Sequence, residues 1–192
     1  MHSPLLADLG LPMIFVEWPL MLCALLPVIG LEGLVIHRSL SLSYRAAFLG
    51  VGKANIYSTL VGVPMAWGIM FLFQLATSLV MIPLALAQQK WHWTVLNAPI
   101  FQAVGFLLSL AWELPLKGQL YWIVPTAATL LLIPCFFVSV RLERRSCLCS
   151  WPSVDPAAVW RSVFLANLWS YGFLFLVACA WVLYHLRHPG LE

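Results

Sequence analysis

The sequence predicts an all-α membrane protein, a polytopic helical bundle, and three observations carry this prediction. Of the 192 residues, 62% are apolar and only 9% are charged, whereas about a quarter of a soluble domain is charged. The mean hydropathy is +0.93. The chain also contains charge-free runs that are long enough to cross about 30 Å of hydrocarbon as helices. Barrel strands would instead give alternating runs of about ten residues, and a water-soluble globule is excluded.

The apolar segments, taken in order, give the expected elements. The first covers residues 12–36 and is interrupted only by Glu17 and Glu32. Charge-free runs then separate Lys53 from Lys90, Lys117 from Arg141, and Arg161 from Arg187, and a shorter run covers 93–112. We predict four full spans near 13–36, 50–73, 119–141 and 161–185. Residues 74–118 would extend the second helix and then form a re-entrant or interfacial hairpin, because prolines and a Trp-His-Trp cluster there suit broken helices at headgroup level.

The amino-terminal segment is expected to be a retained span. Residues 1–10 contain Asp8 but no Lys or Arg, whereas a signal peptide begins with a positively charged region.

The distribution of basic residues discriminates among the possible membrane topologies, because Lys and Arg are enriched in cytoplasmic loops. The two basic stretches contain Arg38, Arg45 and Lys53, then Arg141, Arg144, Arg145 and Arg161. Five spans would divide the ten bases equally between the two faces. Four spans place seven inside, with both termini outside. A break near Pro64 and Gly68 would give six spans and place eight inside. We favour four spans and leave five and six open.

Two parts of the chain resemble each other, which indicates an internal duplication within a single membrane domain, residues 1–192. The pattern Ala-Asn-x-x-Ser begins at Ala54 and again at Ala166, each time soon after a basic loop. Pro27 precedes Arg38 by the same interval that separates Pro134 from Arg145. The repeat units would be 13–73 and 119–186, connected by 74–118, and chance resemblance is the alternative.

Small residues recur every four positions in both units. These candidate packing residues are Ala54, Ser58, Gly62 and Ala66, then Ser162, Ala166 and Ser170. Small-xxx-small faces let helix backbones approach closely in lipid, where the hydrophobic effect does not drive helices together.

Glu32, Asn55 and Asn167 are the candidate residues for a substrate or ion path. A charged carboxylate inside a span costs about 2.5 to 3.5 kcal/mol on insertion scales, so Glu32 needs a proton or a partner. Arg38, Lys53 and Asn55 are candidate partners, and a purely structural role is the alternative.

The remaining polar side chains form no pattern typical of a catalytic or metal-binding site. The histidines are scattered, no carboxylate or cysteine set accompanies them, and we expect no metal, no cofactor and no catalytic residue. Arg141, Arg144 and Arg145 form a cluster suited to anionic lipid headgroups. The roles of Cys147 and Cys149 stay open. Most of the tryptophans lie near span ends, where indole rings anchor helices at the interface.

These features favour a non-catalytic multi-pass protein of an inner or plasma membrane, an accessory or helix-packing subunit of a complex. Its partners would be the bilayer and other membrane subunits or a second copy of itself. The net charge of +3 does not imply nucleic-acid binding. The alternative is a small transporter or channel with a polar site at Glu32, Asn55 and Asn167. An intramembrane enzyme using Glu32 and His37 is least favoured.

Overall fold

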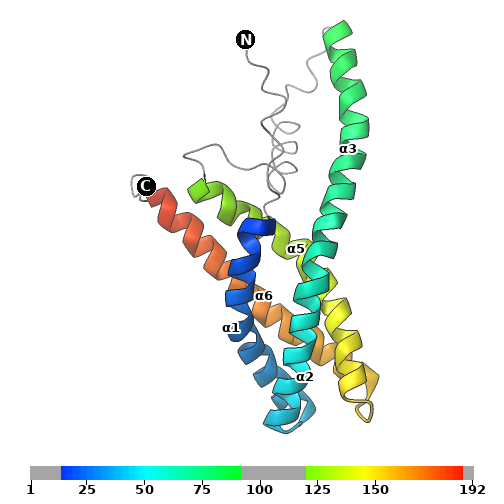
Figure 1. The fold of residues 1–192 in the computed structure, drawn as a ribbon, viewed down its shortest axis with the longest axis vertical. Helices are drawn as coiled ribbons and strands as arrows, with labels where there is room; N and C mark the ends of the chain where they lie inside the picture. The colour runs from blue at the N-terminus through cyan, green and yellow to red at the C-terminus, as the bar shows by residue number, and fades with distance from the viewer. Residues whose placement is uncertain (1–13, 92–119, 188–192) are drawn as a thin grey trace.

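The computed structural model describes residues 14–91 and 120–187, and all regular structure in these two ranges is helical (Figure 1). This confirms the all-α prediction for the described residues. In chain order the helices are α1 (Ile14–Leu40), α2 (Tyr44–Tyr57), η2 (Ser58–Gly62), α3 (Val63–Trp91), α5 (Leu120–Ser150) and α6 (Pro156–Arg187). In the segment 74–118, predicted to extend the second helix and then form a hairpin, α3 continues to Trp91, and the rest of the segment lies outside the described residues.

Two short turns connect the helices at one end of the molecule (Figure 1). After α1, Ser41 has φ 52, and Ser43 caps α2 by accepting a hydrogen bond from the backbone N–H of Ala46 at 3.3 Å. Before α6, the Asp155 carboxylate accepts from the N–H groups of the second and third residues after it, at 3.3 and 3.0 Å. Each cap satisfies backbone donors that a helix start leaves unpaired.

The described residues form four helical rods, namely α1, the continuous rod α2–η2–α3, α5 and α6, which are arranged in a closed ring. α1 packs against α2 and α6, and α5 packs against α6 and against the continuous rod made by α2, η2 and α3. The chain therefore leaves the turn end along α2 and returns to it along α5 (Figure 1). The main core lies near the turns and includes Ile36, Val51, Cys147, Trp151 and Val163.

The helices extend further toward the turns than the predicted spans. α1 ends at Leu40 rather than near 36, and α5 ends at Ser150 rather than near 141. Hydropathy marks where apolar sequence stops, whereas Arg and Lys are good helix formers that continue a helix into polar surroundings. Span ends and helix ends therefore differ by two to three turns in α5.

The second rod is helical from Tyr44 to Trp91, and it contains a π-helical turn, η2, at Ser58–Gly62. The rod continues through Pro64 and Gly68, so the break on which the six-span alternative depended is not found there. A proline ring clashes with the carbonyl four residues earlier, and the wider π turn lies where this clash would fall. Such turns are often found at functional sites.

The two small-residue faces lie inside the molecule. Ala54, Ser58, Gly62 and Ala66 are buried, and a Cβ added at Gly62 would lie 3.2 Å from Leu142 and 3.4 Å from Val138 of α5. Ser162, Ala166 and Ser170 are buried as well. Both faces therefore pack against helices of the same chain.

Large apolar side chains cover much of the outer surface of the described helices. Leu26 is 80% exposed, and Leu79 and Leu176 are each 68% exposed. Among the described residues, two segments are long and apolar enough to cross a membrane, Met21–Leu40 in α1 and Pro156–Tyr184 in α6. An apolar exterior of this kind is suited to lipid rather than to water.

Candidate functional site: a buried pair of carboxyl groups

Two acidic side chains meet in the interior of the ring. Glu32 of α1 is 1% exposed and Glu143 of α5 is 4% exposed. Each lies about two helical turns from the end of its helix at the turn end of the molecule. Both glutamates border the same small hollow, and Asn55 and Ser58, three residues apart in sequence, each donate to one of the two carboxyl groups. Buried acidic groups are rare unless they are paired or hydrogen-bonded.

The Glu32 carboxyl group accepts one hydrogen bond at each oxygen. The Asn55 Nδ2 of α2 donates to Oε2 at 2.6 Å, and the Ser170 Oγ of α6 donates to Oε1 at 2.5 Å. Asn55 also donates to the backbone carbonyl of Val51 at 3.2 Å, which fixes its orientation. Arg38 and Lys53, the other expected partners of Glu32, are exposed.

Glu143 has the equivalent pair of donors. The Asn167 Nδ2 of α6 donates to Oε2 at 2.6 Å, and the Ser58 Oγ at the start of η2 donates to Oε1 at 2.9 Å. Asn167 also donates to the Val163 carbonyl at 3.1 Å. Each glutamate therefore accepts one hydrogen bond from an asparagine of the helix that follows it in sequence and one from a serine of the other half of the described chain. The two halves are residues 14–91 and 120–187.

This arrangement joins the two halves through side chains at their centre. Asn55 follows Glu32 by 23 residues, and Asn167 follows Glu143 by 24. In each half the serine follows the asparagine by three residues and also bonds to its backbone carbonyl. Because every carboxyl oxygen has a donor from a different side chain, the loss of any one donor leaves a buried acceptor unsatisfied.

The space around the pair differs on its two sides. On the side toward the turns, a small hollow is bordered by Ile36, Val51, Cys147 and Ala166 and has no space for a water molecule. The amide oxygen of Asn167, which borders this hollow, is buried without a hydrogen-bond partner. The dense packing leaves no space for a hydrated metal ion beside the pair on this side.

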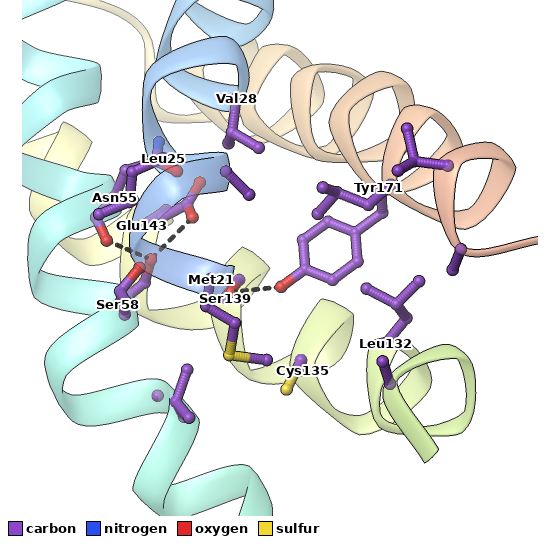
Figure 2. Close-up of a pocket in the computed structure, with 18 of the residues that line it drawn as sticks. Met21, Leu25, Val28, Asn55, Ser58, Leu132, Cys135, Ser139, Glu143 and Tyr171 are labelled. Carbon is purple, nitrogen blue, oxygen red and sulfur yellow. Dashed lines mark hydrogen bonds between the residues drawn. The ribbon is translucent and has the colours of Figure 1, made fainter. Parts of the chain in front are cut away.

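On the other side a cavity of about 350 Å³ extends from Glu143 between the helices. Asn55, Ser58 and Glu143 form its polar end, whereas its walls are mainly apolar and include Leu132 and Val28. Figure 2 shows the hydrogen bond between Ser58 and Glu143 at one end of this space. A volume of this size lies at the lower end of the range for small-molecule sites.

A second polar group lies on the cavity wall. The Tyr171 hydroxyl of α6 and the Ser139 hydroxyl of α5 are 2.8 Å apart and form a hydrogen bond. Figure 2 shows the Tyr171 ring reaching across the space toward Ser139, at a distance from the Ser58–Glu143 bond. The cavity thus has an acidic end and a neutral hydrogen-bonding group on its wall.

The structure brings together the three residues expected at a substrate or ion path, Glu32, Asn55 and Asn167, in one hydrogen-bonded cluster. Ser58 and Ser170, expected only to pack, are also the hydroxyl donors of this cluster.

Glu143 is the member of the cluster that the sequence analysis missed. It lies among Arg141, Arg144 and Arg145, so its neighbourhood indicated a headgroup-binding cluster rather than a buried acid. The signal that identifies it is its spacing to Asn167, which nearly repeats the spacing from Glu32 to Asn55. The same hydrogen bonds make Glu143 equivalent to Glu32. The proline spacing pairs Arg38 with Arg145. That alignment of the two sequence segments is shifted by about one helical turn from the alignment that pairs Glu32 with Glu143.

The remaining candidate residues lie outside the cluster. The three arginines of α5, Arg141, Arg144 and Arg145, are exposed, and the Arg144 guanidinium lies 5.1 Å from the ring centre of Trp160. Their exposure is compatible with the expected contact with headgroups. Cys147 is buried and Cys149 is exposed, and both are free thiols.

Within the described ranges no group of three or more His, Cys, Asp or Glu side chains is arranged to hold a metal ion. Comparisons with protein-family models, with curated proteins and with solved structures found no match to the chain.

Proposed function

We propose that the chain is a multi-pass protein of the cell membrane, a small transporter in which the Glu32–Glu143 pair binds and releases a proton. The observation that carries this proposal is that two buried carboxyl groups border one small hollow, with Glu143 also at the end of a cavity. Two buried carboxylates so placed repel each other strongly, so we infer that they share one proton. Ionisable groups inside membrane spans typically belong to proton relays or substrate paths.

The arrangement of the halves supports transport. If the two halves are parallel repeats, their boundary is where transporters of repeated architecture place their sites. The cluster lies at that boundary, and each half supplies one glutamate, one asparagine and one serine. The π turn η2 places Ser58 and Gly62 beside the cavity, and a local widening of this kind gives a helix a place to change its geometry.

An accessory role in a complex is less well supported by the site. That hypothesis depended on small-residue faces available to partner helices, whereas both faces are buried within the chain. A packing role also does not require two buried acidic side chains that border one hollow. An apolar pair of similar volume would pack as well and would avoid the cost of removing charge from water.

Proton movement in reconstituted vesicles tests the proposal. Purified protein is placed in vesicles of phosphatidylethanolamine and phosphatidylglycerol that contain a pH-sensitive dye, and small amphiphiles with cationic, neutral or acidic heads are added outside. We expect at least one class to move protons faster than in protein-free vesicles. Glu143→Gln should abolish this excess, whereas Asp155→Asn, which changes an exposed carboxylate, should retain it. Equal proton movement in wild-type and Glu143→Gln vesicles for every class would contradict the proposal.

A further inference from the structure

The distribution of charged and apolar side chains around the cavity indicates which class of ligand it can bind. Its polar end is acidic, because Glu143 reaches it, whereas its walls are mainly apolar. Glu32 does not line the cavity and lies behind Glu143, beside the closed hollow. A ligand in the cavity can therefore contact the Glu143 carboxyl group directly, whereas Glu32 can influence the ligand only through Glu143.

Among the residues that the structure describes, no basic side chain borders the cavity. The arginines of α5 nearest in sequence to Glu143 are exposed on the outside of the bundle. The hydrogen bonds to the pair all come from neutral asparagine and serine side chains. When the shared proton leaves, the negative charge that it exposes therefore has no cationic partner among the described residues that contact the pair, so a ligand cation can take the place of the proton.

We propose that the cavity binds a lipophilic organic cation, a protonated amine attached to an apolar group, and that the cation binds in exchange for a proton of the carboxyl pair. This inference rests on the proposed proton-binding function of the pair. The ammonium group would lie at Glu143 beside Asn55 and Ser58. The apolar group would occupy the space bordered by Leu132 and Val28.

The exchange conserves charge at the site. The proton leaves the pair for the solvent when the ammonium group arrives, and it returns when the ligand leaves. A buried carboxylate in an apolar cavity favours an organic cation over an inorganic ion, because the apolar walls cannot replace the water shell of a small ion but do stabilise an apolar group.

The direction of the pH dependence follows from this exchange. Deprotonated carboxyl groups bind the cation and protonated ones do not, so the affinity rises as the pH rises. The limit is about tenfold per pH unit when one proton is released per ligand. Among the described residues, the other titratable groups that border the hollow or the cavity are the Cys147 and Cys135 thiols of α5 and the Tyr171 phenol of α6. None of these groups ordinarily carries charge near neutral pH.

Binding calorimetry with two matched probes tests this inference. The probes are 4-phenylbutylamine and 4-phenylbutanol, which share an apolar group and differ in the head. Titrations of the full chain in detergent run from about pH 6 to about pH 8, where an alkylamine stays protonated because its pKa lies near that of lysine, about 10.4. We expect the amine affinity to rise several-fold per pH unit and the alcohol affinity to stay constant.

Three variants test separately the effect of the Glu143 charge, the effect of the space in the cavity, and the effect of removing an unrelated carboxylate. Glu143→Gln should remove the preference for the amine and its pH dependence while alcohol binding is retained, which shows that the cavity is still folded. Ala128→Phe, at the cavity wall, should weaken the binding of both probes. Asp155→Asn should leave both affinities unchanged.

The results have definite meanings. Equal, pH-independent affinities for the two probes, or binding of neither, would overturn the inference. If an acidic or neutral amphiphile drives proton movement in vesicles while the amine does not bind, the transporter proposal stands and the ligand class is wrong. If the amine binds with the expected pH dependence but no probe moves protons across the vesicle membrane, the ligand class stands and transport is wrong.

Discussion

The Gly50→Ala substitution tests how tightly the turn end of the bundle is packed. A Cβ atom at Gly50 would lie 2.3 Å from Cζ2 and 2.7 Å from Cε2 of Trp151. The indole ring is buried in the core, and its Nε1 donates to the Ala46 carbonyl at 3.3 Å. Because carbon atoms pack at about 3.5 to 4.0 Å, the ring must move by more than 1 Å, and its hydrogen bond is then lost.

The expected cost is the balance of three effects. Overpacking of a core costs about 1 to 3 kcal/mol, and loss of the indole hydrogen bond costs about 0.5 to 1.5 kcal/mol. In the opposite direction, replacing a glycine inside a helix by alanine stabilises by about 0.5 to 1 kcal/mol. We therefore expect Gly50→Ala to lower the free energy of unfolding by about 0.5 to 4 kcal/mol.

Gly52→Ala is the matched control in the same helix. No atom lies within 4 Å of a Cβ added at Gly52, so only the helix effect applies and the variant should be more stable by about 0.5 to 1 kcal/mol. Unfolding in mixed micelles with increasing fractions of a denaturing detergent, followed by tryptophan fluorescence, gives both values. If Gly50→Ala is as stable as Gly52→Ala, the contact of α2 with Trp151 is refuted.

Three other predictions concern the packing of η2 against α5, the hydrogen bond from Ser170 to Glu32, and the burial of the two cysteines near the end of α5. Gly62→Leu should destabilise the chain by about 1 to 3 kcal/mol through overpacking against α5. Gly68→Leu has nothing within 4 Å, so only the helix effect applies and it should stabilise by about 0.5 to 1 kcal/mol in micelle unfolding. Ser170→Ala removes one donor of the Glu32 carboxyl group and should cost about 1 to 3 kcal/mol in the same assay; an unchanged midpoint would count against that bond. Cys149 should react rapidly with a maleimide in the native protein and Cys147 only after unfolding, as mass spectrometry of labelled peptides would show; equal labelling rates would contradict the burial of Cys147.

The helices themselves were predictable from the sequence. Apolar length alone indicated α1, the second rod, α5 and α6, because a lipid-facing exterior needs long runs without charge. Their ends toward the turns were not predictable from apolar length, since arginine continues a helix as well as leucine does. The π turn at η2 left no signal that was recognised, although Pro64 just after it disfavours a regular helix through the preceding turn.

The cluster was predictable only in part. Glu32 stood out because it interrupts an apolar run, and Asn55 and Asn167 stood out because their local pattern recurs. Glu143 did not stand out, since it is surrounded by arginines and its burial depends on which face of α5 meets the other helices. That choice is made by packing against η2 and α6, which involves residues far away in sequence.

Infrared spectroscopy of the protein in lipid tests the central claim, a proton shared by Glu32 and Glu143, most directly. At neutral pH the wild-type protein should show the C=O absorption of a protonated carboxyl group, and the band should shift in D2O. The band should disappear in the Glu32→Gln, Glu143→Gln double variant and persist in Asp155→Asn. A wild-type spectrum without the band, or a band unchanged in the double variant, would contradict the claim.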